Sequence, residues 1–142
     1  MTSTLIPDIT RVSHDIMRVL KRRMVCCGTD DLHMGQLHAL AYVSEKGGMT
    51  MKQLANALQV SSPSATTFVD RLVAMKFLTR THDADNRRIV RLTVTPAGRK
   101  AYIRKMAEKQ RIVGGMLGSV SDADKKEFLR ILKGILTNCT KG

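Results

Sequence analysis

Aromatic residues are scarce in this 142-residue chain, which has no tryptophan, two tyrosines and three phenylalanines. Proteins that bind single-stranded nucleic acid or unpaired RNA bases stack those bases on aromatic side chains. The composition therefore argues against both classes. The chain also lacks an apolar run near 18 residues, the length that suggests a membrane-spanning helix. Its first seven residues lack the charged start and apolar core of a signal peptide, so we expect a cytoplasmic protein with no membrane partner.

Acidic residues are also few, because 12 of them stand against 24 lysines and arginines, and the net charge is +12. This balance favours a polyanionic partner, nucleic acid before an anionic membrane, although a merely basic surface is the alternative. The excess is concentrated between residues 76 and 111, where only three acidic residues occur. The basic residues of this stretch are Lys76, Arg80, Arg87, Arg88, Arg91, Arg99, Lys100, Arg104, Lys105, Lys109 and Arg111.

The stretch from Thr50 to Lys76 predicts two helices joined by a turn. Thr50 can cap a helix, and Gln53 follows at the spacing of a capping box. A second helix is expected from Pro63 to Lys76, with Ser62 as its cap and Pro63 in its first position. At 100° per residue, one side of this helix is apolar and the other is polar. The apolar side holds Ala65, Phe68, Val69 and Leu72, and the polar side holds Thr66, Thr67 and Asp70, with Arg71 at its edge.

The polar side of this second helix is small and rich in hydroxyl groups near its N-terminus. Such a face fits a DNA major groove about 12 Å wide, while an ordinary solvated helix face is the alternative. Two strands should follow, at residues 77–82 and 88–95, around the charged turn of residues 83–87. A hairpin that carries Arg87 and Arg88 at its tip, directly after a helix-turn-helix, is typical of a wing. Arginine suits the narrow, electronegative minor groove.

The wing sequence resembles the signature of MarR-type winged-helix regulators. It reads Leu78-Thr79-Arg80, then Asp83-Ala84-Asp85-Asn86-Arg87-Arg88, then Leu92-Thr93 and Gly98. The family pattern has a short strand, Asp-Pro-x-Asp-Arg-Arg and Leu-Thr-x-x-Gly. This chain departs from it at Ala84, where proline is common, and at Asn86, where an aspartate usually braces the wing arginines. Both arginines are kept, and the resemblance covers nearly the whole chain.

Four further helices are expected outside this lobe, over about residues 8–24, 33–45, 96–117 and from 121 onward. Thr29-Asp30-Asp31 is expected to cap the second of them, Thr95-Pro96 to start the third and Ser121 to cap the fourth. The fourth helix has a broad apolar face, which favours packing on a second subunit over an intrachain lid. That face holds Phe128, Leu129, Ile131, Leu132, Ile135 and Leu136. The resemblance likewise implies a two-fold dimer built from the first helix and the last two.

The fold expected is therefore mostly α, a winged helix-turn-helix lobe with a small β-hairpin, plus N- and C-terminal dimerisation helices. We expect one domain over residues 1–142, with the lobe at about 48–95 and the dimerisation helices at about 8–46 and 96–138. No catalytic triad, phosphate loop or metal-ligand motif is present, so we expect neither an enzyme nor a cofactor. Cys26, Cys27, His33 and His38 could meet around a soft metal, but their spacing does not favour it, and we assign no metal site.

The resemblance also suggests two ways of sensing. Members of the family bind small aromatic acids, and the residues whose positions could line such a cleft are His14, Arg18, Met34, Leu37 and His38. Other members sense oxidants through thiols, which makes Cys26 and Cys27 the redox candidates. Arg22 and Arg23 could lower a nearby thiol pKa, while the alternative is that both cysteines only fill a helix end. The two are adjacent, too close to bridge each other readily, and three cysteines suit a reducing compartment.

These observations predict a homodimeric DNA-binding transcriptional regulator, a repressor that a small aromatic ligand or thiol oxidation releases from an inverted-repeat operator. The alternative is a regulatory or scaffold protein that uses the same fold to bind a protein partner. The predicted DNA-binding residues are Ser62, Ser64, Thr66, Thr67, Arg71, Arg87 and Arg88.

Overall fold

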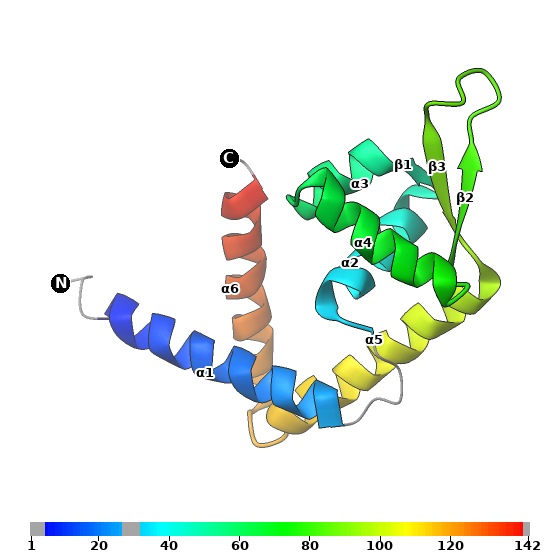
Figure 1. Ribbon diagram of the computed structural model, residues 1–142. Helices are drawn as coiled ribbons and strands as arrows, with labels where there is room; N and C mark the ends of the chain where they lie inside the picture. Colours follow the sequence, from blue (N-terminus) through cyan, green and yellow to red (C-terminus); the bar gives the residue numbers. More distant parts are fainter. Residues whose placement is uncertain (1–4, 27–31, 141–142) are drawn as a thin grey trace. The chain divides into compact units, whose positions relative to one another are not determined.

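A computed structural model describes residues 5–26 and 32–140, and the side chains from residue 25 to residue 31 lie outside the description. The elements, in chain order, are α1 (Leu5–Cys26), α2 (Met34–Lys46), β1 (Met49–Thr50), α3 (Met51–Leu58), α4 (Ser62–Ala74), β2 (Leu78–His82), β3 (Val90–Val94), α5 (Pro96–Met116) and α6 (Asp122–Thr140). Figure 1 shows them as a mostly helical chain with one small sheet, which confirms the predicted fold class. The chain forms two compact units, divided after residues 27 and 107.

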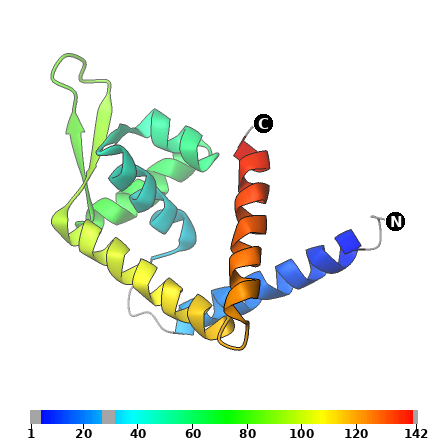
Figure 2. The ribbon, with the colours of Figure 1, turned by 180° about the vertical axis from the view of Figure 1, so that it is seen from behind.

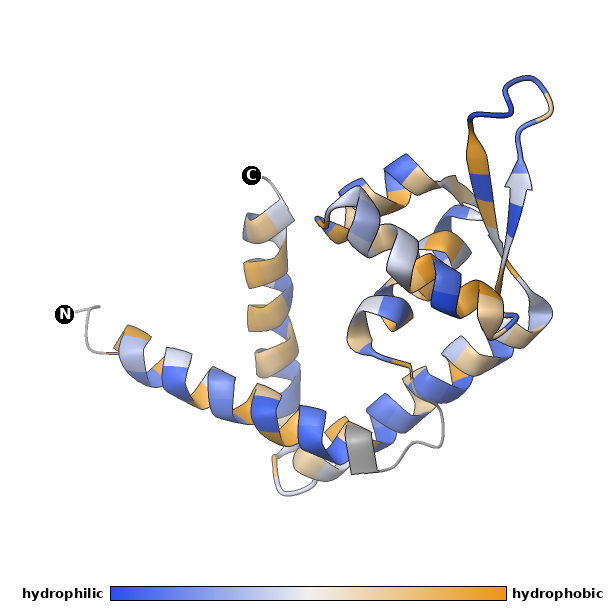
Figure 3. Cartoon of the chain, viewed as in Figure 1, coloured by the Kyte–Doolittle hydropathy of each residue, from blue (hydrophilic) through white to orange (hydrophobic). Residues whose placement is uncertain are grey.

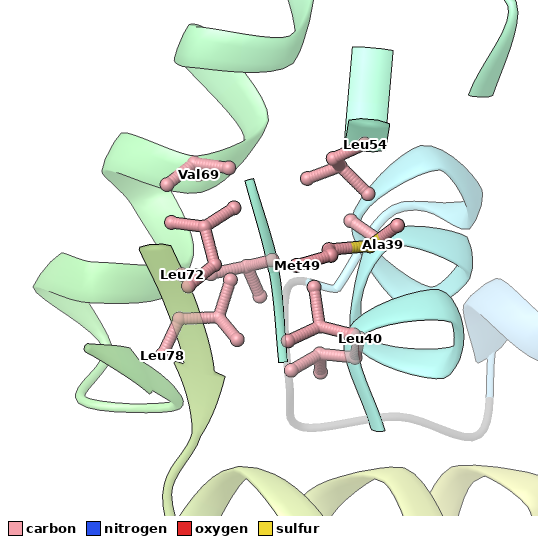
Figure 4. Packing of buried hydrophobic residues seen from close by; sticks show 9 residues of the cluster. Ala39, Leu40, Met49, Leu54, Val69, Leu72 and Leu78 are labelled. Carbon is pink, nitrogen blue, oxygen red and sulfur yellow. The ribbon is translucent and has the colours of Figure 1, made fainter. Parts of the chain in front are cut away.

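The unit that runs from α2 into α5 has one apolar core. Side chains from α2, β1, α3, α4, β2 and β3 meet there, as Figure 4 shows. The buried members are Ala39, Leu40, Val43, Met49, Leu54, Val69, Leu72, Leu78 and Leu92. Leu58 of α3 and Phe68 of α4 are only half-buried and do not occupy the centre of this core. Leu40 and Val43 take that central place, so α2 is part of the structural support of the helix-turn-helix.

Local capping signals define the helices of this unit. Thr50 Oγ1 accepts a bond from the Gln53 amide, and Gln53 Oε1 accepts one from the Thr50 amide, so the predicted capping box is confirmed. At α4 the predicted cap is wrong by one residue, because Ser61 caps the helix, Ser62 is its first residue and Pro63 its second. Proline is tolerated in the first turn, where its missing amide has no helical partner, so either register satisfies the local rule.

The start of α2 also differs from the prediction. His33 is its N-cap, and the His33 amide donates to Gln36 Oε1 at 3.0 Å, although the sequence placed His33 inside the helix. The predicted capping turn at Thr29-Asp30-Asp31 lies outside the described residues. In the other unit, Ser121 Oγ accepts from the Asp124 amide at 3.1 Å, which confirms the predicted cap of α6.

The sheet has the strand order β1-β3-β2, and both pairings are antiparallel. The sequence predicted the β2–β3 hairpin but missed β1, which is only two residues long and pairs with β3 through Met49 opposite Leu92. Arg80 stands opposite Leu92 and His82 opposite Val90 in the hairpin. Seen from either side, the hairpin extends beyond α3 and α4 as a wing (Figures 1 and 2).

The base of the wing is fastened to the start of α5. Thr95 Oγ1 donates to the Lys76 carbonyl at 2.7 Å and accepts from the Gly98 amide at 3.0 Å, while the Thr95 amide donates to the Phe77 carbonyl. Gly98 packs so closely that a Cβ atom there would lie 2.1 Å from the Phe77 carbonyl oxygen. The residue at this position must therefore be glycine for α5 to begin against the end of the α4–β2 turn.

Candidate nucleic-acid interface

The exposed face of α4 presents two threonines whose hydroxyl protons are already used. Thr66 Oγ1 donates to the Ser62 carbonyl at 2.9 Å, and Thr67 Oγ1 donates to the Pro63 carbonyl at 3.0 Å. A hydroxyl has one proton and two lone pairs, so each side chain offers solvent an acceptor and a methyl group. In a major groove these suit the amino groups of adenine and cytosine and the methyl group of thymine.

The first turn of α4 is a compact cluster of serine hydroxyls. Ser61 Oγ accepts from the Ser64 amide at 3.3 Å and also bonds Ser64 Oγ at 2.9 Å. Ser64 is half-buried and engaged in the cap, while Ser62 is exposed beside it. Of the residues that the sequence assigned to DNA on this helix, Ser62, Thr66, Thr67 and Arg71 are exposed, and Ser64 is less accessible.

The tip of the wing is shaped by two asparagine- or aspartate-based turns. Asp83 Oδ1 accepts from the Asp85 amide at 3.0 Å, and Asn86 Oδ1 accepts from the Arg88 amide at 3.1 Å. Such side-chain bonds to a backbone amide two residues on are the usual reason for these residue types in turns. His82 Nδ1 lies 2.9 Å from the Arg87 carbonyl oxygen and ties the end of β2 to the far side of the tip.

An acidic brace is present in the wing, but it differs from the one that the resemblance implied. Asp83 Oδ2 accepts from Arg91 Nε at 2.8 Å, and this bond holds the pKa of the Asp83 carboxyl below its ordinary value. Asn86 supports a turn by accepting from the Arg88 amide, and in the described part of the chain its side chain has no arginine side chain as a hydrogen-bond partner. Arg87 and Arg88 are exposed, and among the described residues neither guanidinium forms an ion pair. Both side chains are therefore available to an anionic partner.

A groove of about 680 Å³ brings the helix face and the wing together. Helix α3, the start of α4 and the wing next to its tip form the walls of this groove. The lining residues are Thr50, Met51, Lys52, Ala55, Asn56, Val60, Ser62, Thr66, Arg88, Ile89 and Val90. Three of the predicted DNA-binding residues, Ser62, Thr66 and Arg88, thus border one concave surface. Lys52 and Asn56 of α3, which the sequence interpretation did not assign to DNA, also line this groove.

A second ion pair connects the two elements that the sequence assigned to DNA. Arg80 of β2 donates through Nη2 to Asp70 Oδ1 of α4. Neither this pair nor the Asp83–Arg91 pair was predicted. The partners are ten and eight residues apart in the sequence, and the packing of α4 against β2 and the strand register bring them together.

The residues predicted to line an effector cleft lie in both units. His14 and Arg18 are exposed on α1, where Arg18 pairs with Asp15 at 2.8 Å. Met34 and His38 are exposed on α2, and Leu37 is buried. The cleft itself stays a prediction. Of the redox candidates, Cys26 is the last residue of α1 and its side chain lies outside the described part, as does all of Cys27.

Neither a cluster of metal-ligating side chains nor a membrane-crossing helix occurs among the described residues. No cluster of three or more histidine, cysteine, aspartate or glutamate side chains in residues 5–24 and 32–140 could hold a metal ion. Over the same part of the chain, no helix combines the length and the apolar character that crossing a membrane requires.

Comparison with known proteins places this site in a family. The profile of the MarR family matches residues 32–90. The chain is 27% identical to the uncharacterized HTH-type transcriptional regulator YwhA of Bacillus subtilis, over 66% of this chain and 67% of that protein. It is 25% identical to the HTH-type transcriptional repressor MdtR of Bacillus subtilis, over 68% of this chain and 62% of that protein. The match thus spans about two thirds of the length of these relatives.

Solved structures share the fold over nearly the full chain. A MarR family protein from Bacillus stearothermophilus superposes with a TM-score of 0.85 at 23% identity, covering 99% of each chain. The YusO protein from Bacillus subtilis superposes with a TM-score of 0.79 at 20% identity, covering 96% of this chain and 98% of that one. The helix-turn-helix, the wing and these similarities agree: residues 32–90 match the MarR family, and the chain has the winged helix-turn-helix fold of the solved structures.

Proposed function

We propose that this protein is a homodimeric transcriptional regulator that binds duplex DNA. Helix α4 enters the major groove with Thr66 and Thr67, and Arg87, supported by Arg88, enters the flanking minor groove. The observation that carries the proposal is the groove that joins the first turn of α4 to Arg88 at the tip of the wing. Because one lobe presents a groove-reading helix and unpaired arginines side by side, a double helix fits it better than a protein surface.

The charge of the chain supports a polyanionic partner. The net charge is +12, and the wing adds two arginines that form no ion pair within the described residues. Each phosphate contact releases counterions, so binding through this surface is expected to weaken steeply with salt. Ser62, Thr67 and Arg71 extend the same surface along α4. We propose that Thr67 reads bases and that Arg71 contacts or braces the backbone.

Exposed apolar faces on two helices support the homodimer. Helix α6 has no buried residue, and Phe128, Leu132 and Leu136 are 46%, 45% and 63% exposed. On α1, Ile9 and Val12 are also about half exposed, and Figure 3 shows the apolar stripe along α6. Covering such side chains stabilises an assembly by about 1.5–3 kcal/mol for each one fully buried. A second copy of the chain, which carries the same faces, is the partner that we propose.

We further propose that the protein is a cytoplasmic repressor without enzymatic activity. The name of the relative MdtR, a transcriptional repressor, supports that mode of action. Two events could release the protein from DNA. One is oxidation of Cys26 or Cys27, and the other is binding of a small aromatic acid near His14, Arg18, Met34, Leu37 and His38. The second candidate function, a scaffold that binds a protein partner through the same lobe, would not require free arginines at the wing tip.

Sedimentation and DNA binding, measured on the same sample, test the proposal. The parent protein first selects duplexes from a random-sequence pool, and anisotropy titrations then compare the selected duplex with a shuffled one. We expect a dimer that prefers the selected duplex about 10³-fold or more and loses affinity as salt rises. A scaffold protein would show the same weak affinity for both duplexes.

Two substitutions on α6 distinguish binding by the dimer from binding by a single lobe. Leu132→Asp should give a monomer that retains only weak, salt-sensitive binding, because one lobe reads a single half-site. Lys126→Asp removes a positive charge from the same helix outside its apolar face and should leave the dimer intact. A monomeric Leu132→Asp protein that binds the full selected duplex like the parent would contradict the dimeric mode.

A further inference from the structure

Helix α4 carries a single acidic residue, Asp70, and it lies on the face that we assign to DNA. The helix sequence is SPSATTFVDRLVA, and Asp70 stands one turn after Thr66 and Thr67. The side chain of Asp70 is 56% exposed. A carboxylate at this position would repel DNA phosphates if it were unpaired. Its presence on a DNA-facing helix therefore needs a structural explanation.

Arg80 of β2 supplies the partner. Its guanidinium pairs with the Asp70 carboxylate, and its own side chain is 36% exposed. Arg80 follows the buried Leu78 by two residues and stands opposite the buried Leu92, so it lies on the core side of the hairpin. The pair thus extends the contact between α4 and β2 beyond the apolar packing of Leu72 and Leu78.

The rest of the wing is braced within itself. Asp83 binds Arg91, His82 contacts the Arg87 carbonyl oxygen, and Thr95 fastens the base. A hairpin braced in this way carries its tip along when its strands shift. A contact between β2 and α4 therefore influences the distance between the helix face and Arg87.

We infer that Asp70 and Arg80 are a positioning pair that sets the recognition helix and the wing at one spacing, and so makes the protein selective for the distance between its major-groove and minor-groove contacts. The inference rests on the proposed DNA-binding function. Exposed ion pairs contribute little to folding stability, so the variants that test it should fold normally.

The test compares Asp70→Asn, Arg80→Gln and the double variant on three duplexes. The first is the duplex that the parent selects from a random pool, the second has its A·T-rich flanks moved outward by one base pair, and the third is shuffled. Asp8→Asn and Arg11→Gln are the matched controls, because Asp8 and Arg11 form an exposed ion pair on α1 and undergo the same charge changes. Thermal unfolding of every variant verifies the fold.

We expect the parent to prefer the selected duplex over the displaced-flank duplex by about tenfold, the scale of one mismatched base pair. Both single variants should lose this preference, and the double variant should lose no more than either, since residues that act as a unit are not additive. The controls should keep it. A changed net charge alters the affinity for both duplexes alike, so it cancels in the ratio of the two affinities measured on one variant. If the pair acted only through its charge, the affinities would change and their ratio would not.

Three outcomes would overturn the inference. If the parent binds the selected duplex and both single variants keep the full preference, the pair does not set the spacing, and the proposed function stands. If Asp70→Asn alone changes base preference while Arg80→Gln behaves like the parent, Asp70 contacts a base directly. If the parent shows no preference among the three duplexes, the proposed function fails, and the inference fails with it.

Discussion

Asp83 and Arg91 are joined across the wing, with Arg91 Nε donating to Asp83 Oδ2 at 2.8 Å. The Asp83 side chain is only 17% exposed, and both of its carboxylate oxygens accept hydrogen bonds within the hairpin. The wing is therefore braced by Arg91, an arginine outside the tip. Arg87 and Arg88 remain exposed beside it, and this arrangement determines what each substitution in the wing should do.

Replacing Arg87 should weaken DNA binding without unfolding the wing. We expect Arg87→Ala to reduce affinity by about 1–3 kcal/mol, the scale of one good groove contact. The loss should be largest where A·T pairs narrow the flanking minor groove. Anisotropy titrations on flanks of different A·T content measure it, and Arg11→Ala on α1 is the control for removal of one charge. Parent-like binding by Arg87→Ala at moderate salt would show that the wing tip does not contact DNA.

The Asp83–Arg91 bond predicts how the wing responds to acid. The bond lowers the pKa of Asp83 in the folded state, so the native protein binds this proton less readily than the unfolded chain. The stability that the bond contributes is present above the ordinary aspartate pKa and is lost as pH falls through the lowered value. Carbon NMR of the Asp83 carboxyl should give a midpoint below that of the urea-unfolded chain. A midpoint at or above the unfolded value would contradict the brace.

Thr67 and Arg71 should affect binding in different ways. Thr67 offers an acceptor and a methyl group, so Thr67→Ala should change the preference among operators. Arg71→Ala should weaken all sequences similarly and reduce the salt slope by about one. Titrations over a series of salt concentrations, on selected and shuffled duplexes, distinguish the two. If Thr67→Ala lowers the affinity for both duplexes equally, Thr67 does not read bases.

Gly98 should be a strict requirement of the fold. A Cβ at this position would lie 2.1 Å from the Phe77 carbonyl oxygen, so Gly98→Ala should destabilise the protein by about 1–3 kcal/mol. Gly114→Ala is the control, because its Cβ would meet nothing within 4 Å and alanine stabilises a helix interior by about 0.5–1 kcal/mol. Urea unfolding measures both. Equal stability of the two variants would mean that α5 can move away from Phe77.

The sequence predicted the elements whose signals are local. The Thr50–Gln53 box and the Ser121 cap each depend on residues three apart, and both are confirmed. The cap of α4 was placed one residue late, since Ser61 and Ser62 are chemically equivalent candidates and tertiary packing chooses between them. The two-residue strand β1 has no periodicity that a sequence could show.

The candidate site was predicted in part. The helix face and the wing arginines follow from helical period and turn chemistry. The pairs Asp70–Arg80 and Asp83–Arg91 depend on strand register and on how α4 packs against β2, which distant residues determine. Lys52 and Asn56 are candidates only because they line the groove, which the folding of α3 beside α4 and the wing creates. The effector residues and the dimer stay predictions, because both require contacts beyond a single lobe.

Methylation interference on the selected duplex tests the central claim most directly, namely that each lobe reads a major groove with α4 and the adjoining minor groove with the wing. Dimethyl sulfate methylates guanine N7 in the major groove and adenine N3 in the minor groove. The account predicts that N7 methylation blocks binding in two half-sites with centres roughly 10 bp apart, and that N3 methylation blocks binding in the flanks outside them. Interference in the minor groove should disappear with Arg87→Ala. Binding that neither modification affects, or interference confined to one groove, would contradict the account.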